Sequence, residues 1–524
     1  MTDTARKPEF GSDVIVDLLL DLGIEYAAFN PGASFRGIHD SIVNHAGNRP
    51  RIVECTHEEI SVAIAHGYAK AAGKPMAAIA HDVVGLQHAT MAIFNAWCDR
   101  VPVLVLGGTG PMDATRRRPW IDWIHTANVQ GTQVRDYTKF DDQPYSLAAV
   151  PESLIRAFRL ATTPPCGPVY VCFDSDIQEE PITASLPAIE PASFPQPARL
   201  APDPEAVNRI AEWLVDATSP VVIPDRVGFR QAAVDRLVEL AELLALPVLD
   251  DRLVSMNFPT AHPLNLSGAE KELLPRADVV LALDCRDLFG ILHGSDTRGG
   301  AMTLALPAGA KVGHVTLDML VTRSWTSDFQ RLQPADLCVP AEPESFLLAL
   351  LPACRDRLAA DGAARDRIEL RRRALAERSR GLRATSRSRA AAAQADGRIA
   401  LPGLSLAVWD RVKNRDFVLA NGTLDSWTQR IWDFESASQW AGLSGGAGLG
   451  YGLGASAGVA LAHRGSDKIV VNFQADGDAL MTPGALWTIA QQKLPVLTLM
   501  NNNRAYQNSV DHAERVARVR RRPV

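Results

Sequence analysis

The chain alternates short apolar runs with segments of helical period, a pattern typical of parallel sheets covered by helices. The first 185 residues contain four such runs, EYAAFNPG, PMAAIAHD, VPVLVLGG and PVYVCFD, which end in turn or polar residues and are mostly followed by a helical pattern. The pattern repeats from roughly 200 to 350 in SPVVIPD, ALPVLDD, ADVVLALD and KVGHVTLD. After residue 400 it continues with KIVVNFQ, ALWTIAQQ and PVLTLM as strand, helix and strand. We therefore expect an α/β protein with three doubly wound parallel-sheet domains.

Two stretches interrupt this rhythm and divide the chain. EEPITASLPAIEPASFPQPARLAPDPE is rich in proline without a sustained period, which is typical of a linker. Residues 355–397 are rich in Ala and Arg, and their high helix propensity and low hydrophobicity favour a solvated connecting helix with a mobile end. The predicted units are an N-terminal domain (1–185), a central α/β domain (195–350), the helical linker (355–397) and a C-terminal domain (400–524).

Composition excludes several classes of protein. The 524 residues are 47% hydrophobic with a formal net charge of −6, which disfavours a nucleic-acid surface. No run approaches 18 apolar residues, and MTDTARKPEF lacks the apolar core of a signal peptide, so we expect a cytoplasmic protein without a membrane partner. The seven cysteines form no CxxC pair, so neither a zinc site nor a disulfide framework is expected.

Polar residues follow both strands of the last unit. Asp476 and the run Asn501–Asn503 stand across one strand–helix–strand unit, so both could face one crevice at the sheet edge. Carboxylate, amide and carbonyl oxygens are the ligands that hold Mg²⁺ beside phosphate oxygens. Without a cation, an acid about 4 Å from a phosphate charge would be repelled by roughly 4 kcal/mol. On these residues alone, a turn-capping Asp and an Asn loop explain the pattern equally well.

The pattern resembles the signature of thiamine diphosphate enzymes, in which Gly-Asp-Gly is followed by just under thirty residues and an Asn pair. In that family the signature holds the metal and the cofactor diphosphate. Here Ala475 replaces the first Gly, Asp478 stands where Ser is more common, and there are three Asn. By spacing, the resemblance implies Mg²⁺ ligands at Asp476, Asn503 and the Ala505 carbonyl. A competing register would use Asp478.

A Gly-rich segment precedes this signature, as it does in that family. SGGAGLGYGLGASAGVALA spans 444–462, and Leu449 matches the large apolar residue that forces the cofactor into its V shape. The resemblance assigns the Ala447 carbonyl and the Leu449 amide to the aminopyrimidine. It also implies cofactor contacts from residues near the diphosphate, which are Asn421, Gly422, Thr423, Gly477 and Asp478.

The same segment supports a rival hypothesis. Residues 450–455 satisfy the dinucleotide pattern GxGxxA, which would suit a nicotinamide- or flavin-dependent oxidoreductase. A dinucleotide fingerprint requires a strand immediately before it, and SASQWAGLSGGAGL does not have a strand pattern. The oxidoreductase is therefore the second hypothesis.

The N-terminal domain supplies an acid for such a cofactor. Glu58 stands nine residues before the Gly67-Tyr68-Ala69 motif, at the start of a predicted helix, and this spacing resembles the family's catalytic Glu. In the family this carboxyl binds N1′ of the aminopyrimidine and promotes loss of the thiazolium C2 proton. The alternative for Glu58 is an ordinary acid that complements a helix N-terminus.

Two further features stand at strand ends in this domain. Asn30, Pro31 and Gly32 follow EYAAF and are assigned to the cofactor site, and His81 follows PMAAIA. In decarboxylases of the benzoylformate type, a Ser follows this NPG and a His assists proton transfer. Ala33 removes that Ser, whereas His81 matches the His. His81 could equally be a structural histidine at a turn.

The resemblance extends over nearly the whole chain, and the acetolactate synthase-like and benzoylformate decarboxylase-like enzymes are the nearest groups. It implies a thiamine diphosphate- and Mg²⁺-dependent decarboxylase or carboligase that acts on a small 2-oxo acid or related carbonyl. It also implies a homodimer or homotetramer with sites at subunit interfaces. Some acetolactate synthase-like members hold FAD, but 195–350 contains no specific motif for it, so FAD is the less favoured cofactor.

The C-terminal domain looks shortened, because only 21 residues follow Asn503, where the family continues through a segment that covers the site. Either the sequence given ends early or the protein is a shortened form. This leaves a cofactor-binding but inactive homologue as the third hypothesis.

Overall fold

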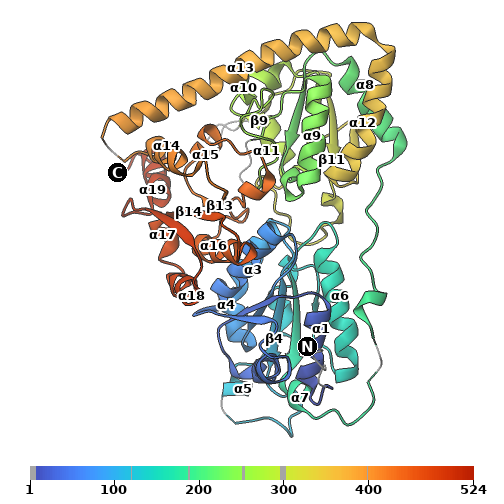
Figure 1. Ribbon diagram of the computed structural model, residues 1–524, viewed down its shortest axis with the longest axis vertical. Helices are drawn as coiled ribbons and strands as arrows, with labels where there is room; N and C mark the ends of the chain where they lie inside the picture. The colour runs from blue at the N-terminus through green and yellow to red at the C-terminus, as the bar shows by residue number, and fades with distance from the viewer. Residues whose placement is uncertain are drawn as a thin grey trace.

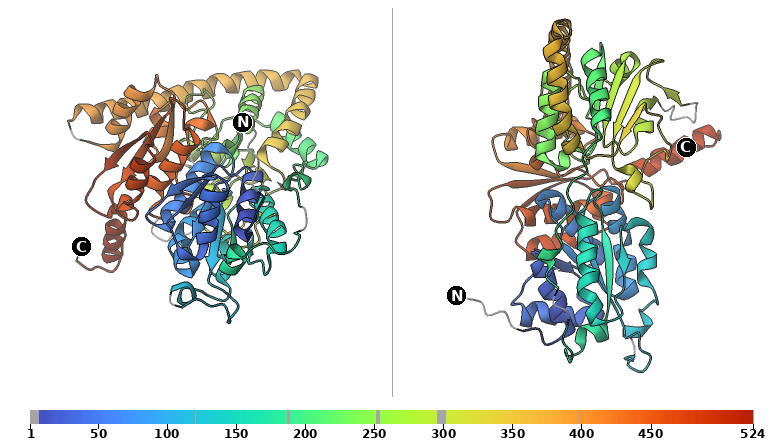
Figure 2. Two further views of the ribbon diagram at one scale, coloured as in Figure 1. Left: turned by 60° about the horizontal axis from the view of Figure 1, so that its bottom comes forward. Right: turned by 90° about the vertical axis from the view of Figure 1, so that its right-hand side faces the viewer.

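The computed structural model describes residues 7–119, 121–186, 189–250, 254–294, 302–397 and 399–523. Three α/β units surround a central junction, with the N-terminal unit at the bottom of Figure 1, the central unit at the upper right and the C-terminal unit at the left. The side view in Figure 2 shows the central unit stacked above the N-terminal one. Among the described helices, none has the length and apolar character needed to cross a membrane.

The N-terminal unit is built on a six-stranded parallel sheet of order β2-β1-β3-β4-β6-β5. Its strands are β1 (Tyr26–Phe29), β2 (Arg51–Glu54), β3 (Ala77–Ala80), β4 (Leu104–Thr109), β5 (Asp141–Asp142) and β6 (Val169–Asp174). Its helices are α1 (Gly11–Asp21), α2 (Arg36–Asp40), α3 (Glu58–Ala72), α4 (Asp82–Cys98), α5 (Ile121–Ile124), α6 (Val150–Thr162) and α7 (Ser175–Glu179). Separate hydrophobic cores lie on the two faces of the sheet, which is why its inner strands are apolar throughout.

The central unit has a four-stranded parallel sheet of order β12-β11-β8-β7. The strands are β7 (Pro220–Pro224), β8 (Val279–Leu283), β11 (Lys311–Val315) and β12 (Leu337–Val339), with a separate pair of β9 (His293–Gly294) and β10 (Thr303–Leu304). The helices are α8 (Pro204–Asp216), α9 (Gln231–Leu244), α10 (Glu270–Leu273), α11 (Leu288–Leu292) and α12 (Pro343–Ala360). The strand predicted at ALPVLDD is reduced to isolated bridges at Val248, because Pro247 has no N–H with which to extend a ladder.

The C-terminal unit has a three-stranded parallel sheet of order β13-β14-β15. The strands are β13 (Phe417–Gly422), β14 (Ile469–Ala475) and β15 (Val496–Asn501). The helices are α14 (Leu401–Val412), α15 (Trp427–Ile431), α16 (Tyr451–Ala462), α17 (Asp476–Ala479), α18 (Ala485–Gln491) and α19 (Gln507–Val519). The predicted connecting helix is α13 (Gly362–Ala395), which runs across the top of Figure 1 from the central to the C-terminal unit. The start of the predicted linker belongs to α12 instead.

The N-terminal and C-terminal units meet where α3 lies against α16. The contact is so close that glycine is required on both sides. A Cβ atom on Gly67 would lie 2.1 Å from the Ala455 carbonyl oxygen, and one on Gly458 would lie 2.0 Å from the Ile64 carbonyl oxygen. The two helix backbones are therefore in direct contact. α3 begins at the predicted catalytic residue Glu58, and α16 begins after the Gly-rich loop that is predicted to contact the cofactor.

We predict that Gly458→Ala destabilises the protein, because an added methyl group must push α3 away from α16. Overpacking of this kind costs about 1–3 kcal/mol of unfolding free energy. The matched control is Gly381→Ala in α13, where an added Cβ meets nothing within 4 Å. That change should be neutral or stabilise the protein by up to about 1 kcal/mol through helix propensity. Denaturant titration of both variants measures the difference, and equal stabilities would contradict the backbone contact.

Candidate active site

Glu58 lies at the first position of α3 and is only 4% exposed. Its Oε1 accepts a hydrogen bond from Asn30 Nδ2 at 3.3 Å, and its Oε2 lies 3.2 Å from His88 Nδ1. The helix is capped by His57, whose Nδ1 accepts the Glu59 N–H. The structure thus brings Glu58 together with Asn30 at the carboxyl ends of neighbouring elements, and Asn30 contacts the acid itself.

His88, which no motif in the sequence singles out, also contacts Glu58. Its ring stacks on that of His57 with a centroid distance of 4.5 Å, and its side chain is 56% exposed. Burial and the neighbouring His88 lower the pKa of His57. Glu58 is therefore a buried carboxyl that reaches the surface beside an exposed imidazole. His88 stands in the middle of a helical pattern, so only the fold reveals its partner.

His81 follows β3, and it lies among polar groups. Its Nδ1 is 3.0 Å from Ser34 Oγ, and its Nε2 is 3.3 Å from His125 Nδ1. Gly32 is needed here because a Cβ on it would lie 2.5 Å from the His81 Cβ atom. Ala33 stands where benzoylformate-type decarboxylases have a Ser, so that hydroxyl is missing here. The hydroxyl of the next residue, Ser34, lies against His81 instead. The chain of Ser34, His81 and His125 can pass a proton along three polar side chains.

The loop after β15 lies beside the end of β14, as the parallel register requires. Ala475 pairs with Asn501, and the next residue, Asp476, accepts the Arg504 N–H through Oδ2 at 3.0 Å. Asn503 Oδ1 accepts the Ala505 N–H at 3.1 Å, which shapes the loop as a tight turn. The expected proximity of the acid and the asparagine loop is therefore present.

Asp478 has a different environment from Asp476. Its Oδ1 accepts the Gly450 N–H at 2.6 Å, and its Oδ2 is bound by Gln474 Nε2. Gly450 has a φ of +90° and ends the Gly-rich loop. Both oxygens of Asp478 thus hold this loop against β14, which favours Asp476 over Asp478 as the acid with free ligand capacity.

Burial, followed by the charge of Asp478, raises the pKa of the nearby Glu59 to about 7.

The Gly-rich loop before α16 is held by one residue of α4 and by the residue that caps its C-terminus. The Gly445 N–H donates to Asp99 Oδ1 at 2.6 Å, and the Gly448 N–H donates to Asn95 Oδ1 at 3.2 Å. Ala447, which lies between the two anchored glycines, has a φ of +51°. Leu449 follows the second anchored glycine, and its side chain is 45% exposed. The loop therefore presents a fixed backbone and an accessible apolar side chain.

A buried ion cluster stabilises this anchor. Asp99 Oδ2 lies 2.6 Å from Lys70 Nζ and 3.0 Å from His66 Nε2, and the side chains of His66 and Asp99 are fully buried. Burial alone would raise the pKa of Asp99, but Lys70 and His66 outweigh it and lower that pKa. Lys70 also donates to the Leu443 carbonyl at 2.8 Å. Charges of the N-terminal unit thus fix the loop of the C-terminal unit.

Asn421 and Thr423 both donate hydrogen bonds to the neighbouring strand β14. Asn421 is buried, and its Nδ2 donates to Asn472 Oδ1 at 3.0 Å and to the Phe473 carbonyl at 2.9 Å. Thr423 Oγ1 donates to the same carbonyl at 2.7 Å. These bonds hold β13 to β14 at a register shift, so they favour a structural role for Asn421.

The structural context of the GxGxxA pattern does not suit a dinucleotide. Gly450 precedes α16, but residues 441–450 contain no strand. The glycines of this pattern are instead required by packing. A Cβ on Gly452 would lie 2.4 Å from Gln474 Oε1 and 2.5 Å from Asn421 Nδ2.

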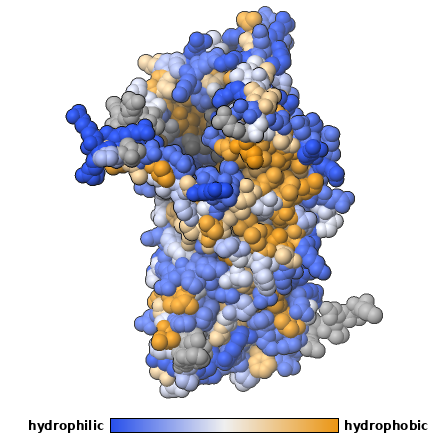
Figure 3. Space-filling model, turned by 90° about the vertical axis from the view of Figure 1, so that its left-hand side faces the viewer, coloured by the Kyte–Doolittle hydropathy of each residue, from blue (hydrophilic) through white to orange (hydrophobic). Residues whose placement is uncertain are grey.

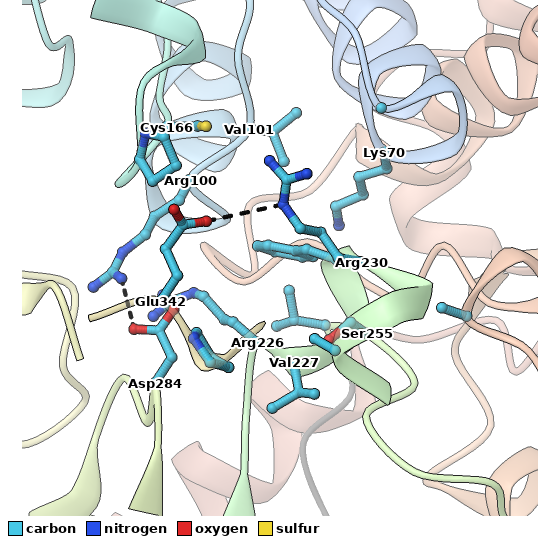
Figure 4. Close-up of a pocket in the computed structure, with 18 of the residues that line it drawn as sticks. Lys70, Arg100, Val101, Cys166, Arg226, Val227, Arg230, Ser255, Asp284 and Glu342 are labelled. Carbon is cyan, nitrogen blue, oxygen red and sulfur yellow. Dashed lines mark hydrogen bonds and ion pairs between the residues drawn. The ribbon is translucent and has the colours of Figure 1, made fainter. Parts of the chain in front are cut away.

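A cavity of about 270 Å³ lies between the N-terminal and central units, at the carboxyl ends of the central strands. Figure 4 shows two pairs of oppositely charged residues in this cavity. Arg100 Nη1 lies 3.0 Å from Asp284 Oδ1, and Arg230 Nε lies 3.9 Å from Glu342 Oε2. Its volume is slightly below the roughly 300–1,000 Å³ usual for ligand pockets. It gives no positive support for FAD.

Domain models of thiamine pyrophosphate enzymes match both ends of the chain. The N-terminal TPP binding domain matches residues 10–133, and the C-terminal TPP binding domain matches residues 420–521. Thiamine pyrophosphate is another name for thiamine diphosphate. The chain belongs to the thiamine diphosphate-dependent enzymes.

Relatives of this thiamine diphosphate-dependent enzyme include acetolactate synthases. A probable chloroplastic acetolactate synthase 2 of Oryza sativa subsp. japonica is 26% identical over 517 residues, covering 94% of this chain and 71% of the relative. The large subunit of Escherichia coli (strain K12) acetolactate synthase isozyme 1 is 25% identical over 513 residues, covering 96% of this chain and 83% of the relative.

Solved structures confirm the fold of the enzyme. A thiamine diphosphate-dependent 4-hydroxybenzoylformate decarboxylase from Rhodococcus jostii RHA1 has a TM-score of 0.74 at 21% identity, covering 96% of this chain and 88% of that one. Benzoylformate decarboxylase from Polynucleobacter necessarius has a TM-score of 0.74 at 18% identity, covering 97% and 88%. These structures confirm the predicted α/β architecture, and the domain models together with the acetolactate synthase relatives confirm the resemblance to thiamine diphosphate enzymes.

Proposed function

We propose that the protein uses thiamine diphosphate and Mg²⁺ to cleave or form a C–C bond beside the carbonyl of a 2-oxo acid or related compound. The observation that carries this proposal is the buried Glu58 carboxyl, which opens to the surface at His88 in a chain that has both cofactor-binding domains. The reaction is that of a decarboxylase or an acetolactate synthase-like carboligase. The bound cofactor supplies the carbon nucleophile and the electron sink.

The metal end of the site fits this cofactor. A carboxylate offers about four acceptor positions, and Asp476 uses one of them for the Arg504 N–H. Asp476, Asn503 and the Ala505 carbonyl would hold Mg²⁺, whose preferred ligands are such oxygens together with phosphate oxygens. Asp478 would act indirectly by fixing the Gly-rich loop.

The aminopyrimidine end fits as well. The Ala447 carbonyl and the Leu449 N–H belong to a loop that is held by Asn95 and Asp99 on either side of Ala447. Because the loop is fixed before the cofactor binds, little ordering is needed at that moment. The exposed Leu449 side chain would set the bend of the cofactor.

Glu58 would hold the proton that is exchanged with the aminopyrimidine ring. Asn30 and His88 orient its two oxygens. His81, with Ser34 and His125, would move protons at the carbonyl of the substrate. Both reaction types need these two proton sites, so the polar chain at His81 does not select between them.

The site is proposed to be shared between two subunits. The contacts described for Glu58 come from its own N-terminal unit, whereas the adjacent Glu59 faces Gly450 and Asp478 of the same chain. Figure 3 shows apolar side chains gathered on the side where the C-terminal unit lies. Exposed apolar residues of that unit include Leu449, Leu480, Met481, Leu486, Trp487, Leu497 and Met500. Such a surface suits a second copy of the chain.

We predict that Asp476→Ala abolishes Mg²⁺-dependent stabilisation by thiamine diphosphate. A ligand that binds only the folded state raises the melting temperature by mass action. In the parent protein we expect a rise with thiamine diphosphate and Mg²⁺ but little or none in excess EDTA. The control is Asp425→Ala, an acid after β13 with no assigned ligand role. Equal shifts with and without a divalent ion would refute the metal site.

We predict that Glu58→Gln slows exchange of the cofactor C2 proton by about 10²- to 10⁴-fold, the usual range for a general acid–base group. The variant should retain its fold and much of its cofactor affinity, because Gln preserves the shape of the side chain. The matched control is Glu54→Gln, an exposed acid on β2. Exchange is followed by NMR in deuterated buffer, which requires no knowledge of the substrate. Near-normal exchange in Glu58→Gln would leave Glu58 as an ordinary helix-terminal acid.

A further inference from the structure

A second cavity of about 500 Å³ lies beneath α13, where this helix crosses from the central to the C-terminal unit. In Figure 1 the helix passes above α10 and α15, and residues around these elements line the cavity together with α13. We call it the linker cavity. None of its lining residues belongs to the candidate active site.

The linker cavity is strongly basic. Its lining residues include four arginines, Arg378, Arg383, Arg389 and Arg430, and a single acid, Asp250. The Asp250 oxygens already accept the N–H groups of Asn257 and Phe258 and the Asn257 side-chain amide, and its single negative charge does not balance four guanidinium groups. The remaining lining adds hydroxyl and amide groups. The cavity therefore carries an excess of positive charge.

Two of the four arginines lack an acidic partner. Arg378 pairs with Glu272 at 2.6 Å, and Arg383 pairs with Asp433. Arg389 and Arg430 instead each lie 5.3 Å from the ring centroid of Trp427. Over the described residues, neither of these two guanidinium groups has a carboxylate within ion-pair distance. Trp427 thus holds two unneutralised guanidinium groups at one wall.

Gln429 adds a donor that the protein leaves unused. Its Oε1 accepts a hydrogen bond from Thr428 Oγ1 at 3.3 Å, but its Nε2 is buried and has no partner among the described residues. A buried donor without a partner destabilises the folded protein. Gln429 lines the linker cavity beside Arg430, so a rotation of its amide would bring Nε2 to an acceptor oxygen bound there and remove this cost.

We propose that the linker cavity binds a small phosphorylated molecule through Arg389, Arg430 and the Gln429 side-chain amide. A phosphoryl dianion has three acceptor oxygens and matches the planar fork of arginine, so it can satisfy both guanidinium groups and the amide together. The cavity volume lies within the range usual for small-molecule sites. Since Arg389 belongs to α13 and Arg430 to α15, the ligand ties the connecting helix to the C-terminal unit.

The test is calorimetric titration of the full-length protein, first saturated with thiamine diphosphate and Mg²⁺ so that the cofactor site is filled. The probes are inorganic phosphate, AMP and glucose 6-phosphate, with sodium chloride at matched ionic strength. These arms separate free phosphate from a nucleotide or a sugar ester as the natural source. The same titration without cofactor gives a result that does not depend on the proposed enzymatic function.

We predict that at least one phosphorylated probe binds and that the double variant Arg389→Gln/Arg430→Gln weakens its binding by at least about tenfold, since charge-assisted hydrogen bonds are roughly twice as strong as neutral ones. The matched control is Arg373→Gln, a residue of the same helix that is 77% exposed and pairs with Glu369. It should leave the affinity unchanged. Equal affinity in the parent and the double variant, or the same heat from chloride alone, would overturn the proposal.

Gln429→Met tests the site without removing charge. Loss of the unpartnered buried donor should raise the melting temperature of the ligand-free protein, and the same change should reduce the shift that the binding probe produces. A merely structural Gln429 would lower the melting temperature on substitution and leave the probe-induced shift intact, which would refute its part in the site.

Discussion

The backbone contact between α3 and α16 sets the geometry of everything around it. Gly67 and Gly458 bring each helix within contact distance of a carbonyl oxygen on the other. α3 begins at Glu58, and α16 begins directly after the Gly-rich loop that ends at Gly450. Because interiors are close-packed and resist small displacements, a change at this contact shifts the proposed acid and the proposed cofactor loop of the same chain, which the shared-site proposal assigns to two different sites.

The buried ion cluster of Asp99, Lys70 and His66 is a second link between the N-terminal and C-terminal units. Burying these groups is expensive, and only their mutual pairing and hydrogen bonds compensate for it. Asp99 uses one oxygen for the cluster and the other for the Gly445 N–H. The loop that presents Ala447 and Leu449 is therefore positioned by an ion cluster on the neighbouring unit. Loss of Asp99 would leave Lys70 buried without its partner and release the loop at once.

Much of the architecture could be predicted from the sequence because each strand is a short apolar run that ends in a turn or polar residue. Asp476 and the asparagine loop could be placed together for the same reason, since the parallel register aligns the ends of β14 and β15. The preference for Asp476 over Asp478 in the proposed metal site comes from the fold, in which Asp478 is bound to Gly450. The family resemblance supplied Glu58, because an acid at a helix start has no distinctive local pattern.

Other features depend on contacts between residues far apart in the sequence. Ser34 and His125 approach His81 from separate parts of the chain, so no sequence spacing predicts these contacts. Asn421 looked like a strand-end ligand, yet its amide joins β13 to β14. The failed strand at Val248 reflects a single proline within an apolar run. In each case the role of the residue depends on which distant residue it contacts, and a single sequence does not show those contacts.

The central claim is that Glu58 and the Asp476 loop act on one cofactor from two chains, and subunit complementation tests it most directly. Glu58→Gln and Asp476→Ala chains are unfolded and refolded together, native mass spectrometry confirms mixed oligomers, and C2 proton exchange is measured. If sites are shared, random mixing in dimers restores about one quarter of the parent sites, because half of the dimers are mixed and each has one intact site. Exchange that stays at the level of the two separate variants despite confirmed mixed oligomers would place the whole site within one chain.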